Sequence, residues 1–297
     1  MSAPFDAERF REHAATLALG HPIVATLHTG STNDDALAAA RDGAPHGALF
    51  VTEEQSAGRG RRGNTWLAPR GEGLLFSLVL RPELGPERAP ALALLAGLAV
   101  RAAVAELLDA RATHARTLTE NDAAEAAEPR VLVKWPNDVV IVTDKLRKLA
   151  GVLVESVVRG GRLGAVVIGV GLNVGRLGLP SELADMATSL ALLGVTVTRE
   201  RLLANVLAAM EVRLTELETA KHREKPLQSC AAELARFDAL YGSSLRVDDL
   251  FGHGAGIDDE GSLKVVDPSG RTHRVVSGHV TLAQVDGRAE KVGERAG

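Results

Sequence analysis

Hydrophobic and polar positions along this chain predict a sheet flanked by helices. Short apolar runs bounded by polar residues or glycine predict strands, and longer runs with helical spacing predict helices. Strands joined by short links indicate hairpins, hence a mixed, largely antiparallel sheet of the α+β class rather than a regular β-α-β winding. The expected strands lie at 23–27, 47–53, 74–80, 130–135, 139–143, 150–158 and 164–170, and the expected helices at 5–19, 89–110, 199–220 and 227–240. A further helix is expected to be capped by Ser31-Thr32-Asn33 and to run to about Arg41.

The pattern changes after Ser244, where short β-like runs alternate with polar turns. Five such strands in about 45 residues predict a small β-barrel. We therefore expect a catalytic or binding domain at 1–240, a barrel at 241–285 and a flexible tail at 286–297. Residues 111–130 lack hydrophobic periodicity and are predicted to form a solvated insertion.

Composition narrows the class of protein. The 297 residues are 45% hydrophobic and 24% charged, which is typical of a soluble globular chain with a sizeable core. A net charge of −4 argues against general attraction to DNA or to anionic membranes. The single cysteine, Cys230, excludes intramolecular disulfides and cysteine-based zinc sites. The N-terminus does not resemble a signal peptide and the apolar run at 89–100 is too short to span a bilayer, so we expect a cytoplasmic protein.

Residues 58–66, which we call the arginine loop, place three arginines among three glycines directly after an apolar run. Glycine allows close approach of the backbone to a ligand, and arginine matches carboxylate or phosphate oxygens. The spacing also fits the G-x-G-x-x-G dinucleotide fingerprint, but that motif requires a helix to begin at the loop. Pro69, Gly71 and Gly73 prevent a helix here. The loop is therefore predicted to bind an anion outside a Rossmann fold.

Four other segments carry candidate chemistry. Residues 134–138, Lys-Trp-Pro-Asn-Asp, end an apolar strand with several polar groups, and residues 145–155 bring basic residues to the start of another. Residues 169–173 end a third strand with glycines and Asn173, and Ser31-Thr32-Asn33 begins a helix, with Gln55 near the arginine loop. Taken singly, these segments also fit a core tryptophan, an ordinary hairpin, a bent strand and a helix cap.

Taken in order, these motifs resemble those of the biotin protein ligase family over about residues 22–285. The resemblance implies a class II synthetase-like catalytic domain with a small SH3-like C-terminal barrel. It implies that biotin and Mg-ATP react to give biotinyl-5′-AMP, and that biotin is then transferred to a lysine of a biotin carboxyl carrier protein. It leaves a homodimer open. Because the motifs begin at Ser31, the N-terminal DNA-binding domain of some relatives is not expected, nor is DNA or membrane binding.

The resemblance also implies roles for individual residues. The implied catalytic residues are Arg61, Lys148 and Asp138. Those implied to bind biotin are Ser31, Thr32, Asn33, Gln55, Arg59, Gly60, Arg61 and Lys148. Those implied to bind ATP are Arg59, Arg61, Arg62, Trp66, Lys134, Trp135, Asn137, Asp138, Lys148 and Asn173. No protein ligand is assigned to Mg²⁺, which enters with the ATP phosphates.

Two other functions compete with this interpretation. A lipoate ligase has a similar fold and similar adenylate chemistry, but the arginine loop together with Lys-Trp-Pro-Asn-Asp favours biotin. A nucleic-acid-binding module could use Arg59, Arg61 and Arg62, but the net negative charge and the lack of a basic face with interleaved aromatic residues disfavour it.

Overall fold

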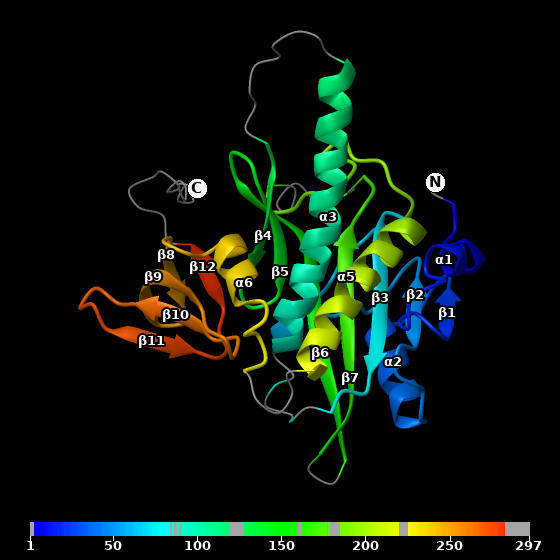
Figure 1. Ribbon diagram of the computed structural model, residues 1–297, viewed down its shortest axis with the longest axis horizontal. Helices are drawn as coiled ribbons and strands as arrows, with labels where there is room; N and C mark the ends of the chain where they lie inside the picture. The colour runs from blue at the N-terminus through cyan, green and yellow to red at the C-terminus, as the bar shows by residue number, and fades with distance from the viewer. Residues whose placement is uncertain are drawn as a thin grey trace.

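The computed structural model describes residues 3–83, 85, 88, 91–118, 128–159, 162–176, 178, 185–219 and 225–282. Its centre is a seven-stranded sheet with the order β1-β2-β3-β7-β6-β5-β4 (Figure 1). β1 and β2 are parallel and every other pair is antiparallel, which confirms the mixed, largely antiparallel sheet. The strands are β1 (Ile23–Thr26), β2 (Leu49–Thr52), β3 (Gly73–Leu80), β4 (Arg130–Lys134), β5 (Asp138–Val142), β6 (Leu146–Arg159) and β7 (Arg162–Asn173).

Helices cover the two faces of this sheet unequally. α3 (Ala91–Leu118) and α5 (Arg199–Thr219) pack together across one face, with α1 (Ala7–His13) beside α5 (Figure 1). α2 (Thr32–Arg41) packs on the opposite face against β2, β3, β6 and β7. Side chains alternate between the faces of a strand, so Ile168 joins the core under α3 whereas Val167 packs with α2. α2 covers only part of its face, and the remainder is available for a site.

α3 is longer than predicted. It continues to Leu118, so residues 111–118 extend the helix instead of beginning an insertion, while 119–127 lie outside the described residues. By length and composition its segment Ala91–His114 is the one helix among the described residues that could cross a membrane. However, 72% of the apolar window is buried within the protein, as expected of a core helix.

The C-terminal part forms an open five-stranded sheet with the order β11-β10-β9-β8-β12. Its strands are β8 (Ser244–Val247), β9 (Leu250–Ile257), β10 (Leu263–Val266), β11 (Thr272–Val275) and β12 (Val280–Leu282), and the short helix α6 (Ala231–Phe237) precedes them. The end strands β11 and β12 do not pair with each other, so the predicted closed SH3-like barrel is not confirmed. Leu245, Val265 and Val280 belong to the same hydrophobic cluster as α3, which fixes this sheet against the larger one. The predicted tail, 286–297, lies outside the described residues.

Strand register determines which residues share the face of α2. Ser77 of β3 is opposite Gly169 of β7, which is opposite Leu153 of β6. Two residues along β6 and β7, Gly151 is opposite Gly171. This region of the face is therefore lined by glycines, over which other side chains can lie. β5 pairs with β6 only as far as Gly151, and beyond this point no described strand pairs with β6 on that side.

Candidate active site

One cavity of about 540 Å³ brings together all the residues that the sequence predicted for the site. The start of α2, the arginine loop, the β4–β5 turn, β6 and β7 each contribute to its wall. The predicted residues in this wall are Ser31, Thr32, Asn33, Gln55, Arg59, Gly60, Arg61, Arg62, Trp66, Lys134, Trp135, Asn137, Asp138, Lys148 and Asn173. Segments far apart in the chain thus converge on one place, although this proximity does not test their individual roles.

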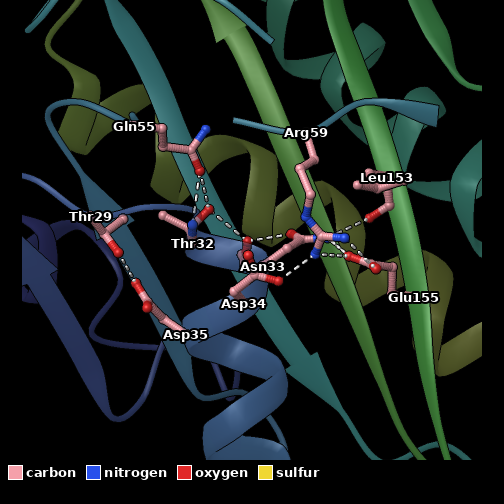
Figure 2. Close-up of polar contacts among 10 residues, drawn as sticks. Thr29, Thr32, Asn33, Asp34, Asp35, Gln55, Arg59, Leu153 and Glu155 are labelled. Carbon is pink, nitrogen blue, oxygen red and sulfur yellow. Dashed lines mark hydrogen bonds and ion pairs between the residues drawn. The ribbon is translucent and has the colours of Figure 1, made fainter. Parts of the chain in front are cut away.

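The start of α2 presents hydroxyl and amide groups to the cavity. Ser31 occupies the N-cap position, yet its side chain makes no capping hydrogen bond, so a capping role does not account for its hydroxyl. Gln55 Oε1 accepts hydrogen bonds from the Thr32 backbone N–H (2.8 Å) and from Thr32 Oγ1 (3.1 Å) (Figure 2). Ser77 Oγ lies 2.8 Å from Thr32 Oγ1 and 2.6 Å from Asn33 Oδ1. These buried contacts fix the orientation of each amide at this end.

The three arginines of the loop lie in different environments. Arg59 is bonded to Asp34 and Glu155, and Arg62, at φ 57°, pairs with Asp248 of the C-terminal sheet. Arg61 makes no ion pair with any residue that the structure describes. Burial lowers the pKa of its guanidinium, and neighbouring Arg62 lowers it further, whereas Asp138 raises it. Among the three, Arg61 is therefore the arginine whose charge no ion pair with a described residue neutralises. Residues 61–63 form a single 3-10 turn and no helix begins here, which confirms the exclusion of a Rossmann site.

Two lysines and one carboxylate form the cationic part of the cavity. Lys148 Nζ lies 2.7 Å from Asp138 Oδ1, and Lys134 Nζ donates to the backbone oxygen of Val280 at 3.3 Å. Burial lowers the pKa of the Lys134 ammonium; Asp138 opposes this shift and Lys148 adds to it. Asp138 forms an ion pair with Lys148 and acts on Lys134 only through longer-range attraction. Two positive charges therefore face one negative charge, and the excess can attract an anionic ligand.

Glycines allow Trp66 to lie flat against the sheet. A Cβ atom on Gly171 would lie 2.3 Å from Trp66 Cε2, and one on Gly151 would lie 3.1 Å from Trp66 Cζ3. Lys148 Nζ is 5.4 Å from the centre of the Trp66 ring. The indole Nε1 is buried without a hydrogen-bond partner among the described residues, so a ligand that accepts this bond would remove a desolvation penalty.

Gly171→Ala is therefore expected to displace the Trp66 indole and to weaken ligand binding. Overpacking typically costs about 1–3 kcal/mol, and a cost of this size in the bound state corresponds to a loss of affinity of about 5- to 150-fold. Titration calorimetry would measure the affinity, and tryptophan fluorescence would report the moved indole. Gly178→Ala is the control, because a Cβ atom there meets nothing within 4 Å. Equal affinities for the two variants would contradict the prediction.

Several predicted side chains line the cavity with their polar groups already occupied. The Trp135 indole is buried in the main core and donates to the Gly261 oxygen at 3.0 Å, a placement that does not support contact between its ring and a nucleotide. Asn137 Nδ2 donates to the Val152 oxygen, and Asn173 Nδ2 donates to the Thr188 oxygen. These two amides brace the cavity wall, and each still has its side-chain oxygen and one N–H for a ligand.

Sequence reasoning missed three parts of the site. Met186 and Ala187 reach the cavity through a parallel bridge to Lys148, although their segment shows no periodic pattern. Residues 278–280 bring the C-terminal sheet into the wall. Ser77 lies within an apolar strand, and nothing in the sequence pattern marked it as a site residue. Its burial is explained by its hydrogen bond to the Asn33 side chain of α2, which the sequence alone does not show.

A second cavity, of about 570 Å³, also borders the arginine loop. Both cavities are lined by residues 59–62, 135–136 and 152–153, so the loop contributes to the wall of each. The second cavity also borders residues 154–156 of β6, where β5 no longer pairs.

Comparison with known proteins identifies the relatives of this chain. Residues 30–173 match the Biotin/lipoate A/B protein ligase family. The chain is 34% identical over 286 residues to the biotin–[acetyl-CoA-carboxylase] ligase of Mycobacterium tuberculosis, covering 93% of this chain and 95% of the relative. It is 31% identical over 255 residues to the bifunctional ligase/repressor BirA of Bacillus subtilis, covering 84% of this chain and 70% of the relative. 

Solved structures share the fold. The Aquifex aeolicus biotin protein ligase in complex with biotin and ATP superposes with a TM-score of 0.67 at 23% identity, covering 89% of this chain and all of that one. The Leishmania major ligase in complex with biotinyl-5-AMP superposes with a TM-score of 0.53 at 26% identity, covering 86% and 98%. The family match, the relatives and the fold together define a ligase of the biotin/lipoate class. The chain belongs to the biotin protein ligase family.

Proposed function

We propose that this protein is an ATP-dependent biotin protein ligase. In the first step the biotin carboxylate attacks the α-phosphate of Mg-ATP, giving biotinyl-5′-AMP and pyrophosphate. In the second step the ε-amine of an acceptor lysine attacks the acyl carbon, forming an amide and releasing AMP. The observation that carries this proposal is that one cavity joins a neutral hydroxyl and amide end to a cationic end.

The two ends suit the two parts of the substrate. Hydroxyls and amides of Ser31, Thr32 and Gln55 can bond a neutral ureido ring. Carboxylate and triphosphate repel each other, and fixed cations at Arg61 and Lys148 would offset this repulsion without reorganisation. Mg²⁺ is proposed to enter as part of Mg-ATP, bound through the ATP phosphates.

For the second step we infer a role for Asp138 and for the C-terminal sheet. Asp138, now paired with Lys148, is placed to orient the incoming amine once Lys148 engages the adenylate. The C-terminal sheet contributes residues 278–280 to the wall and would close over the nucleotide as an SH3-like unit. The acceptor is proposed to be a biotin carboxyl carrier protein, in keeping with the name of the Mycobacterium tuberculosis relative.

Incubation with biotin, Mg-ATP and a carrier domain tests the function directly, and mass spectrometry of the carrier gives the readout. A biotin adduct that requires ATP is expected. Calorimetric titrations with biotin and with lipoate distinguish the two ligases, and a chain that binds lipoate but not biotin would overturn the proposal. Homodimer formation, cytoplasmic location and the lack of DNA binding stay predictions, which light scattering, cell fractionation and DNA retention assays would check.

A further inference from the structure

The carboxylate of Glu155, on β6, joins the ligand-binding end of α2 to the arginine loop. Asn33 Nδ2 donates to Glu155 Oε2 at 2.8 Å (Figure 2). Arg59 Nη1 donates to Glu155 Oε1 at 3.0 Å, and Arg59 Nη2 donates to Oε2 at 2.8 Å. One carboxylate thus accepts three hydrogen bonds from two segments of the cavity wall. Such bidentate pairing fixes direction as well as distance.

Both terminal nitrogens of the Arg59 guanidinium therefore donate hydrogen bonds to carboxylates of the protein. Its Nη2 also lies 2.6 Å from Asp34 Oδ1. The Asp34 side chain is 59% exposed and that of Glu155 only 25%, so the bond to Glu155 is the less screened of the two. This placement differs from the sequence expectation, in which Arg59 contacts biotin and the nucleotide.

Local structure explains why Glu155 can reach both partners. Strand alternation puts Leu153 and Glu155 on the face of α2, and the absence of a side chain at Gly169 lets Asn33 lie against the sheet. A Cβ atom on Gly169 would lie 1.9 Å from Asn33 Oδ1. Because β5 no longer pairs with β6 here, the loop can lie directly beside Glu155.

We propose that Glu155 is a positioning residue that clasps the arginine loop to the start of α2. The proposal rests on the proposed ligase function. Through Asn33 and Ser77, Glu155 is connected to Thr32 at the polar end of the cavity. This chain of hydrogen bonds fixes the position of the loop relative to the residues that we propose bind the ligand. Since the loop forms part of the wall of the cavity, its release would open the wall that is proposed to retain a reactive adenylate.

The test is the rate at which biotinyl-5′-AMP leaves the preformed complex, measured by chase with unlabelled adenylate for wild type and Glu155→Gln. Glutamine still accepts from Asn33 but removes the charge that holds Arg59. We expect escape to accelerate about tenfold, the lower end for a charge-assisted bond. The kcat of pyrophosphate formation at saturating substrate is expected to change much less than the KM for biotin. Glu106→Gln, the same change at an exposed position of α3, is expected to alter neither.

A double-mutant cycle separates loss of the Glu155–Arg59 contact from a general loss of thermal stability in Glu155→Gln. In an Arg59→Gln background, Glu155→Gln is expected to add no further escape, because the clasp is already broken. Additive effects, or unchanged escape in Glu155→Gln, would overturn the clasp. A wild-type protein that forms no adenylate would instead refute the ligase function, which separates the two failures.

Discussion

Lys148→Ala is expected to lower the rate of adenylate formation by about a hundredfold or more. Removing one preorganised charge-stabilising group from an active site has effects of about 10²–10³ in kcat. Lys148 Nζ lies 2.7 Å from Asp138 Oδ1 and 5.4 Å from the centre of the Trp66 ring, in the part of the cavity that we propose binds the carboxylate and the phosphate. Its loss also leaves Asp138 as a negative charge facing an anionic substrate. Biotin-dependent exchange of pyrophosphate into ATP measures this step.

Lys145→Ala provides the matched control for this prediction. Lys145 lies three residues earlier, is 57% exposed and pairs only at 3.5 Å with Asp185. Its replacement is expected to leave exchange unchanged. Both variants should unfold near the wild-type temperature, since the Lys148 side chain is itself 37% exposed. Normal exchange by Lys148→Ala would remove this residue from the reaction.

Arg199→Met is expected to lower the free energy of unfolding by about 3–5 kcal/mol, as is usual when one partner of a buried ion pair is removed. Arg199 Nη1 lies 2.8 Å from Glu53 Oε2, and both side chains are less than a tenth exposed. Glu53 also accepts from the Phe5 backbone N–H, and Arg199 donates to the Ala3 oxygen. The substitution would leave the Glu53 carboxylate buried without its counter-charge.

Urea denaturation measures this loss, with Arg201→Met as the control because Arg201 is exposed on the same helix. Adding Glu53→Gln to Arg199→Met is expected to recover part of the stability, since the uncompensated charge is then gone. Equal stabilities of Arg199→Met and Arg201→Met would show that the pair contributes little. Because Glu53 directly precedes Glu54 and Gln55, the same pair also holds the chain that leads into the site.

Much of the fold follows from local pattern. A continuous apolar run located β3, which is buried along its whole length, and capping residues with a terminating Gly43 located α2. The end of α3 was missed because it projects beyond the sheet, where nothing demands an apolar face. Closure of the C-terminal sheet could not be predicted either, since strand count does not determine whether the end strands pair.

The candidate site was predictable only in part. Motif residues could be named from the sequence, and the structure brings them to one cavity. The commitment of Arg59 to carboxylates, and of Asn173 to a backbone oxygen, depends on contacts between distant segments that no local pattern encodes. Glu155 lay within a recognised motif, yet its partners come from residues 96 and 122 positions away in the chain.

The polar cluster around Thr32 has fewer hydroxyl hydrogens than it has oxygen–oxygen contacts that need one. Three oxygen–oxygen contacts link Gln55, Thr32, Ser77 and Asn33, but only the Thr32 and Ser77 hydroxyls can supply a hydrogen to them. Asn33 Oδ1 and Gln55 Oε1 can only accept, so one contact always opposes two lone pairs. One contact of this cluster therefore has no hydrogen between its two oxygens. A ligand N–H would relieve that conflict only by taking the place of one of the three contacts, and part of the ligand's affinity would then come from completing the protein's own bonding.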